Sequence, residues 1–228
     1  MSRYPGIVNL EVMREAENYN RFLVDLVLSN VQPKDRIVDF GAGAGTFAMP
    51  LRAAGHDVIC IEADSTLVDH LSGHGLTVHD DLDRLEDGSV DYLYSLNVLE
   101  HIADDAATVA LWHRKLRPGG RLLVYVPAFE MLFSSMDRKV GHHRRYRLGA
   151  LRAMLVSAGF RITKARYADS LGFLATMLFK LIGDDSGTIN PRMLRLYDRA
   201  AFPMSRALDS LAGRVGGKNL YIVATKPR

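Results

Sequence analysis

The sequence contains a single cysteine and no apolar leader. Cys60 is the one cysteine among 228 residues, so the chain cannot form an internal disulfide or a cysteine-based metal site. It lies in the strand-like stretch Asp57–Ile61, where we expect it to pack as a small hydrophobic side chain. Chains without disulfides suit a reducing compartment, and the first residues lack the apolar core of a signal peptide. We therefore expect a cytoplasmic protein.

A strong net charge is also missing. The chain has 29 basic and 26 acidic residues, for a net charge of +3, which does not favour a nucleic-acid partner. The most apolar stretch, Leu171–Ile182, is shorter than the roughly 20 residues of a membrane-spanning helix. Three uses stay open for it: a substrate lid, which we favour, a homodimer face, and peripheral contact with an anionic membrane. Five arginines follow this stretch: Arg192, Arg195, Arg199, Arg206 and Arg214.

Strand-like and helical segments alternate along more than half of the chain. Such alternation predicts an α/β fold, with a mostly parallel sheet and helices on both of its faces. A broken helical pattern over Leu10–Val31 predicts two short helices before the first strand. The next predicted strands are Arg36–Phe40, Asp57–Ile61, Leu76–His79, Val90–Ser95 and Arg121–Val126. The predicted helices are Thr46–Ala54, Ser65–Leu71 (with Ser65 as its cap), Asp104–Leu116 and Leu148–Ala158.

The pattern changes after Pro127. Ala128–Arg147 is predicted to be a long polar and basic connection, and two more strands are expected at Phe160–Tyr167 and Lys218–Lys226. The helical segments between these strands predict an insertion over residues 169–217. We expect a single domain over residues 1–228, with residues 1–34 as an N-terminal helical cap and the insertion as a lid.

The first strand runs into a glycine-rich turn, Asp39–Gly45. Glycines at alternate positions permit positive φ angles and let a ligand lie against the backbone. The spacing differs from the dinucleotide fingerprint G-x-G-x-x-G, because Thr46 stands where the third glycine belongs. Glu62, at the end of the second strand, can accept hydrogen bonds from both hydroxyls of a ribose. A nucleoside-containing ligand is indicated, and an NAD enzyme remains one alternative.

Five motifs in order resemble those of class I S-adenosylmethionine-dependent methyltransferases. They are Val38–Gly45, Glu62, Asp80, Ser95–Ile102 and Leu116–Gly120. The resemblance implies a Rossmann-like seven-stranded fold whose last strand is antiparallel, and S-adenosyl-L-methionine as the cofactor.

The resemblance also implies a role for individual residues. The glycines would lie under the methionine and ribose, Asp39 would hold the ammonium, and Glu62 would bind the ribose. Asp80, or Asp81 in its place, would accept the adenine amino group. The implied cofactor-binding residues are Asp39, Gly41, Gly43, Gly45, Glu62, Asp80, Asp81, Leu82, Ser95, Asn97 and Tyr19.

The stretch Phe133–Tyr146 follows the fifth strand and is rich in reactive side chains. It is similar to a Gly-His-x-Arg-Arg-Tyr loop of a bacterial subgroup of these enzymes. We interpret it as an acceptor pocket; a solvated basic loop pinned by its last two residues is the alternative. Asp137 with His142 and His143 could ligate an ion, but nothing in the sequence fixes their geometry, so no metal is predicted. The catalytic candidates are His142, His143, His101, Arg145 and Tyr146.

The predicted function is therefore methyl transfer to a small-molecule acceptor. The acceptor atom is expected to be an oxygen of a carboxylate, phenol or sugar hydroxyl in a natural-product, sugar or lipid-like metabolite. An Asn/Asp-Pro-Pro-Tyr signature for amide substrates is absent, because Ser95–Val98 stands in its place. The alternative is a non-catalytic cofactor-binding or regulatory partner subunit.

Overall fold

The protein is built on one seven-stranded sheet. A computed structural model describes residues 12–182 and 190–228. The strand order is β3-β2-β1-β4-β5-β7-β6, and β7 alone runs antiparallel to its two neighbours while the other pairs are parallel. The predicted Rossmann-like fold with an antiparallel last strand is confirmed. The strands are β1 (Ile37–Phe40), β2 (Val58–Ile61), β3 (Thr77–His79), β4 (Val90–Leu96), β5 (Leu116–Pro127), β6 (Arg161–Ala168) and β7 (Asn219–Thr225).

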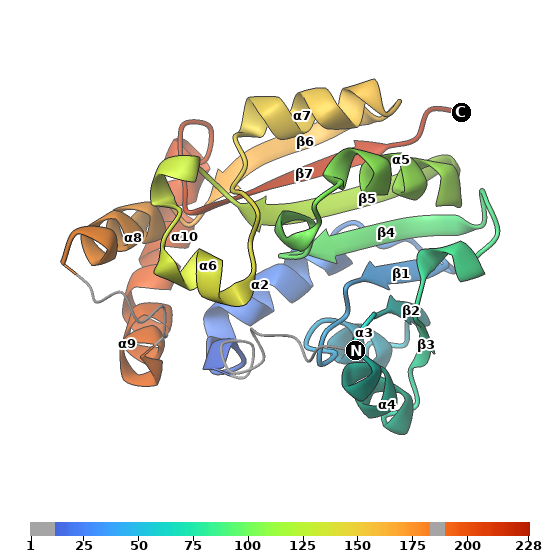
Figure 1. The fold of residues 1–228 in the computed structure, drawn as a ribbon, viewed down its shortest axis with the longest axis horizontal. Coiled ribbons are helices and arrows are strands. Elements are labelled where there is room, and N and C mark those ends of the chain that lie inside the picture. The colour runs from blue at the N-terminus through green and yellow to red at the C-terminus, as the bar shows by residue number, and fades with distance from the viewer. Residues whose placement is uncertain (1–11, 183–189) are drawn as a thin grey trace.

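Helices cover both faces of the sheet, with α5 and α7 on one face and α2 on the other (Figure 1). Before β6 the helices are α2 (Glu17–Leu28), α3 (Ala48–Ala53), α4 (Ser65–Gly73), α5 (Asp105–Lys115), α6 (Ser135–Val140) and α7 (Leu148–Ser157). Between β6 and β7 lie α8 (Ser170–Ile182), α9 (Pro191–Leu196), the π-helical turn η4 (Tyr197–Ala201) and α10 (Phe202–Ala212). Short 3-10 turns are η1 (Leu82–Arg84), η2 (Leu99–His101) and η3 (Glu130–Leu132).

Two hydrophobic cores form because side chains alternate along each strand. On β5, Leu122 and Val124 pack in the core that includes Trp112 of α5. Their neighbours Leu123 and Tyr125 pack in the opposite core, with residues of α2. A central strand that is buried on both faces explains the nearly continuous apolar sequence of this segment.

Three local predictions differ from the structure. β5 begins at Leu116, which pairs with Val90, so the strand is longer than predicted. The connection expected over Ala128–Arg147 contains η3 and α6; Ser134 and Asp137 form a capping box at the start of α6, which can nucleate a helix in a polar segment. The N-cap of α4 is Asp64, whose side chain accepts from two backbone N–H groups, so Ser65 is the first helical residue instead.

The insertion between β6 and β7 packs against α2. The Asp198 carboxylate accepts hydrogen bonds from the backbone N–H groups of Asn18 and Tyr19, both at 2.9 Å. The N-cap residue of α2, Ala16, has no side chain that could do this, so the insertion supplies the missing cap. Parts of the predicted cap and insertion, residues 1–11 and 183–189, lie outside the described residues. Among the helices that are described, none is long and apolar enough to cross a bilayer.

Candidate functional site

A cavity of about 850 Å³ opens at the carboxyl ends of the parallel strands. Phe40, Ile61 and Leu96, the last residues of β1, β2 and β4, all line it. Residues of α2, η2, the loop after α6 and the insertion also contribute to its wall. In Figure 1, α6 and the helices of the insertion gather at this end of the sheet. Open α/β sheets bind their ligands at this edge.

The glycine turn has the backbone conformation that the sequence predicts. Gly41, Gly43 and Gly45 have φ angles of 81°, 56° and 77°, a region in which other residues are strained. A Cβ atom on Gly41 would lie 2.4 Å from a methyl group of Val98. Gly41 and Gly43 line the cavity, whereas Gly45 does not and instead lies close to the side chains of Leu71 and Met49.

Glu62 stabilises this turn through hydrogen bonds and also lines the cavity. Its two carboxylate oxygens accept hydrogen bonds from the backbone N–H groups of Gly43 at 2.8 Å and Asp64 at 2.9 Å. Each carboxylate oxygen can accept a second hydrogen bond, so the side chain can still bind the hydroxyls of a ribose.

Asp39 belongs to β1, two residues before Gly41; it is 2% exposed and is not among the residues that line the cavity. Its Oδ2 atom has no hydrogen-bond partner within the described part of the chain. Burial away from water raises the pKa of Asp39 to about 7. A buried carboxylate oxygen without a partner suits a cationic ligand group, reached directly or through water.

The residues predicted for the adenine lie at the rim of the cavity. Asp80 is exposed and forms an ion pair with Arg84 at 3.3 Å, and this partner lowers the pKa of Asp80. The Asp81 side chain accepts from the N–H of Asp83 and so caps η1. Leu82 is 1% exposed and also lines the cavity. Of the two alternative acids, Asp80 has the side chain without a capping role.

Asn97 and Tyr19 come together although they are far apart in the sequence. The Asn97 amide donates to the Tyr19 hydroxyl at 3.2 Å, and Asn97 has a φ of 55°. The Tyr19 ring meets Tyr125 and Phe202 edge-on, and burial raises the pKa of Tyr19 to about 12. Ser95, by contrast, is buried and does not line the cavity.

Asp137 organises the loop predicted to hold the acceptor. It is fully buried and accepts hydrogen bonds from Nε and Nη2 of Arg145 at 2.8 and 2.9 Å. Its Oδ1 atom also lies 2.7 Å from Nδ1 of His142. Burial works against the charge of Asp137, but the hydrogen bonds from His142 and Arg145 hold its pKa below the ordinary value. An ionised Asp137 keeps the proton of His142 on Nδ1, so that Nε2 is the basic nitrogen.

Two cationic side chains line the same end of the cavity. Arg145 is buried, and its Nη1 atom has no hydrogen-bond partner in residues 12–182 and 190–228. Lys218 also lines the cavity, and burial lowers its pKa. Together they provide an environment that favours an anionic group.

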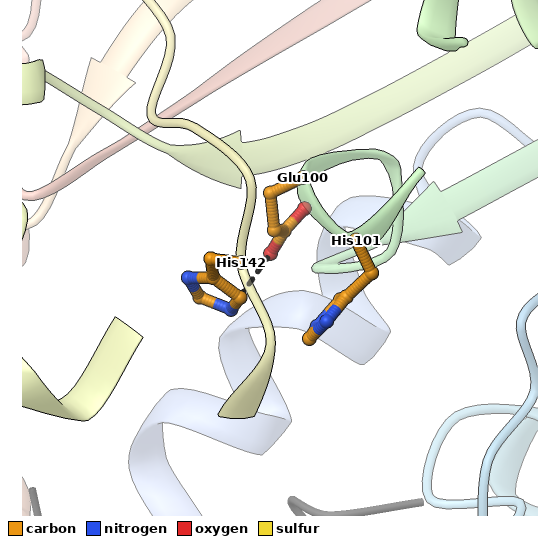
Figure 2. Close-up of side chains that lie close together, drawn as sticks. All are labelled: Glu100, His101 and His142. Carbon is orange, nitrogen blue, oxygen red and sulfur yellow. Dashed lines mark ion pairs between the residues drawn. The ribbon is translucent and has the colours of Figure 1, made fainter. Parts of the chain in front are cut away.

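Glu100, His101 and His142 form a compact cluster in the cavity wall, as Figure 2 shows. Nε2 of His142 lies 3.8 Å from a carboxylate oxygen of Glu100. The imidazole rings of His101 and His142 are arranged edge to face, with their centroids 4.5 Å apart. Burial raises the pKa of Glu100 to about 8. Burial, and then the nearby His142, lower the pKa of His101 to about 4.

Two of the predicted catalytic residues lie away from the cavity. The side chain of His143 is exposed, and its backbone N–H donates to the Glu100 carbonyl. Tyr146 is 5% exposed, and its hydroxyl donates to Asp105 at 2.8 Å. Neither side chain lines the cavity. The structure therefore separates them from His142, His101 and Arg145, which do.

The sequence did not point to Lys218, Asp169 or Glu100 as site residues, yet all three line the cavity. Lys218 and Asp169 flank the insertion, and they reach the cavity only because the sheet places β7 beside β5. Glu100 was visible as an acid between apolar residues and a histidine. An acidic residue at this place, shortly after a strand of the sheet, could have indicated a site residue.

Comparison with known proteins agrees with this geometry. A family model described as a methyltransferase domain matches residues 14–165. The chain belongs to this family. The predictions of a class I S-adenosylmethionine-dependent methyltransferase and of its cofactor are thereby confirmed. Membership in the subgroup with the Gly-His-x-Arg-Arg-Tyr loop stays a prediction.

Curated relatives match only part of the chain. A probable S-adenosylmethionine-dependent methyltransferase of Mycolicibacterium smegmatis is 30% identical over 133 residues, which cover 55% of this chain and 52% of that protein. A ubiquinone biosynthesis O-methyltransferase of Xanthomonas oryzae is 29% identical over 99 residues, 39% of this chain and 41% of that protein. The chain thus spans about half the length, or less, of the curated relatives it matches.

A solved structure extends the similarity of the fold to nearly the whole chain. It is a putative methyltransferase in complex with the Trm112 activator of Haloferax volcanii, with a TM-score of 0.64 and 18% identity. The match covers 99% of this chain and 98% of that chain. At this identity it shows a shared fold only.

Proposed function

We propose that this protein transfers a methyl group from S-adenosylmethionine to an oxygen of a small-molecule acceptor. The acceptor oxygen would belong to a carboxylate, phenol or sugar hydroxyl of a natural-product, sugar or lipid-like metabolite. One observation carries this proposal: His142, whose ring is oriented by Asp137, lines the same cavity as the glycine turn and Glu62.

The cofactor end of the cavity fits the predicted ligand. Gly41 and Gly43 let it lie on the backbone, and Glu62 can bind the ribose. Asp39 lies behind the lining residues and can reach the ammonium through a bridging water. The unpartnered oxygen of Asp39 is the observation that supports this fit. When bound, S-adenosylmethionine supplies a methyl group on a positively charged sulfur, which becomes a neutral thioether as an acceptor oxygen forms the new bond.

The acceptor end can prepare a hydroxyl for this reaction. Nε2 of His142 can take the hydroxyl proton as a general base, because Asp137 holds the ring and stabilises its charged form. Arg145 and Lys218 can hold an anionic group elsewhere on the acceptor. An acceptor that is already a carboxylate needs no base, and His142 would then orient it.

The insertion can act as the lid that excludes water. Leu194, Tyr197 and Phe202 line the cavity from the insertion, and Asp198 fixes this segment to α2. A dry site favours transfer from a sulfonium, because charge on sulfur disappears in the reaction. The name of the Xanthomonas relative, an O-methyltransferase, supports the choice of oxygen over nitrogen.

The decisive experiment combines cofactor binding with product formation. The purified protein is incubated with methyl-labelled S-adenosylmethionine and a panel of carboxylic acids, phenols and sugars, and binding of S-adenosylhomocysteine is measured by calorimetry. Labelled product with an oxygen acceptor supports the proposal. Tight cofactor binding without any methylated product would favour the alternative, a non-catalytic partner subunit. Exclusive methylation of amines would contradict the oxygen assignment.

A further inference from the structure

Three side chains with metal-binding atoms meet in the wall of the cavity. Glu100 and His101 come from η2, at the end of β4, and His142 comes from the loop after α6. One ligand atom of each lies within 4.8 Å of the others. In Figure 2 the Glu100 carboxylate and both imidazoles face a common space. All three residues line the cavity, so an ion between them would be accessible to an acceptor.

Glu100 lacks the partners that a buried carboxylate normally has. Its side chain is fully buried, and neither oxygen finds a hydrogen bond among the residues the structure describes. Its contact with His142 is long, at 3.8 Å. Buried carboxylates without hydrogen bonds are costly unless they are paired or coordinate a metal. A bound cation would satisfy both oxygens of this carboxylate.

The second shell around His142 also suits a metal ligand. Nδ1 of His142 lies 2.7 Å from the Asp137 carboxylate, which leaves Nε2 as the nitrogen toward Glu100. A histidine that ligates a metal usually donates its other N–H to a carboxylate or carbonyl. Two Arg145 nitrogens bind the same carboxylate, so the support is rigid. This arrangement differs from the set of Asp137, His142 and His143 that the sequence suggested, because Asp137 stands behind His142 and His143 is exposed.

We propose that Glu100, His101 and His142 bind a divalent first-row transition-metal ion whose open positions face the acceptor. Two imidazoles and one carboxylate are a ligand set that suits such ions and leaves coordination positions free. The sequence predicted no metal, so this proposal departs from it. It rests on the proposed function in one respect only: the acceptor is expected to bind the ion through a hydroxyl oxygen, in addition to the three protein ligands.

The ion would perform the task otherwise assigned to a base. A hydroxyl bound to a divalent ion has a lowered pKa and releases its proton to water near neutral pH. His142 then serves as a ligand through Nε2, and its proton on Nδ1 stays with Asp137. Arg145 and Lys218 remain available for an anionic group of the same molecule.

The binding test uses Co²⁺ as the probe. The purified protein is treated with a chelator, dialysed and titrated with Co²⁺, and visible absorption is measured. We expect saturable binding of one ion per chain with the spectrum of imidazole ligation. Glu100→Gln and His101→Ala should each weaken the affinity more than tenfold, since each removes one of three ligands. Glu100→Gln keeps the shape of the side chain, and His101→Ala tests the site independently if that variant does not fold.

Two histidine variants serve as matched controls. His143→Ala removes an exposed imidazole from the same loop, and His74→Ala breaks the close pair with His70, whose rings lie 4.4 Å apart. Both should keep the affinity of the unmodified protein. Absence of saturable binding, or equal affinity in Glu100→Gln and His101→Ala, overturns the metal site.

The two proposals can fail separately. If the chelator-treated protein binds S-adenosylhomocysteine and methylates a hydroxyl at an undiminished rate, the metal proposal is overturned and the proposed function stands. If Co²⁺ binds as expected but no acceptor is methylated, the ion site stands and the proposed function fails. Turnover that is lost with the chelator and restored by Co²⁺ supports both.

Discussion

At the residue scale, Asp137 decides the geometry of the acceptor end. One buried carboxylate orients both His142 and Arg145, so two side chains that face the cavity depend on a residue that does not line it. Removing Asp137 would leave a buried guanidinium without its partner, which is strongly destabilising. Variants of His142 are therefore a cleaner probe of the site than variants of Asp137.

His142→Ala should lower turnover with little change in cofactor affinity. General bases contribute about 10²–10⁴-fold to rate, and loss of an orienting or ligating role also reduces the rate. Steady-state kinetics and calorimetry with S-adenosylhomocysteine would check this. His74→Ala, an exposed histidine on α4, is the control and should keep the rate. Normal turnover in His142→Ala would show that the loop carrying His142 has a structural role and does not take part in the reaction.

Glu62→Ala should weaken binding of S-adenosylhomocysteine by roughly ten- to a hundredfold, the cost of losing hydrogen bonds to a charged group. Glu62 also fastens Gly43 and Asp64, so the turn itself loosens. Glu86→Ala is the control, because Glu86 is an exposed acid outside the cavity. This variant should bind S-adenosylhomocysteine as tightly as the unmodified protein. Unchanged calorimetric affinity in Glu62→Ala would remove Glu62 from the cofactor site.

Asp39 predicts a pH dependence for both binding and stability. Its pKa is raised from 3.8 to about 7 in the folded chain, so the folded form holds this proton more tightly than the unfolded chain does. The contribution of Asp39 to the stability of the ligand-free protein should fall as pH rises from about 4 to 7. Affinity for S-adenosylhomocysteine should rise through the same range, because its ammonium favours an ionised Asp39.

The check is a pair of pH series on the unmodified protein and Asp39→Asn. The asparagine cannot ionise, so both dependences should be smaller in that variant. Equal affinity of the unmodified protein at pH 6 and pH 8 would argue against a contact between Asp39 and the ammonium.

At the element scale, the insertion and α2 are joined by a helix cap supplied from a distant part of the chain. Asp198 is 2% exposed and binds two N–H groups in the first turn of α2. A negative charge at a helix N-terminus also interacts favourably with the helix dipole. The same contact fixes Tyr19 near Asn97 and thereby one wall of the cavity.

Asp198→Ala should lower the free energy of unfolding by about 1–2 kcal/mol, the usual cost of losing a cap. It should also raise the KM for the cofactor, because the position of Tyr19 is less fixed. Denaturant unfolding and steady-state kinetics would measure the two effects. Asn190→Ala is a matched control, since Asn190 is exposed and caps α9 inside the insertion. An equal effect of both variants on KM would contradict the role of Asp198 as a link.

At the scale of the whole molecule, the insertion presents an unusually apolar outer surface. Exposed side chains on it are Leu174, Leu178, Met193, Leu196, Met204, Leu208 and Leu211. Two of the arginines that could bind anionic lipid are engaged within the chain. Arg195 pairs with Glu15, while Arg206 pairs with Asp209 and lies over the Phe22 ring. Arg192, Arg199 and Arg214 are exposed on the same segment, so a homodimer and contact with a membrane both stay predictions.

We expect the protein to self-associate through this surface. Sedimentation velocity over a range of concentrations should show a dimer, and Leu211→Glu should shift it to the monomer, because a charge on an apolar interface is costly. Leu211 is 81% exposed, so this substitution should leave the fold intact. A monomer at all concentrations that binds anionic vesicles would instead support peripheral membrane contact.

The sequence by itself determined the sheet, the glycine turn and the family. These features depend on local patterns: apolar strands, positive-φ glycines, and an acid at the end of the next strand. The backbone conformation of the glycines and the position of Glu62 at the end of β2 were therefore predictable, while their role in cofactor binding stays a prediction. Local chemistry also misled in places: Tyr146 and His143 are reactive types of residue, yet one is buried against Asp105 and the other faces solvent.

Only the tertiary structure decided which side chains meet in the cavity. Glu100 and His142 are separated by the whole of α5 and β5, and Lys218 follows the insertion; their proximity depends on how β4, β5 and β7 are ordered in the sheet. Burial likewise depends on neighbours that are distant in sequence, and burial is what leaves Glu100 without hydrogen-bond partners within residues 12–182 and 190–228. A motif can identify the donor of a methyl group, but the environment of its acceptor is assembled by long-range packing.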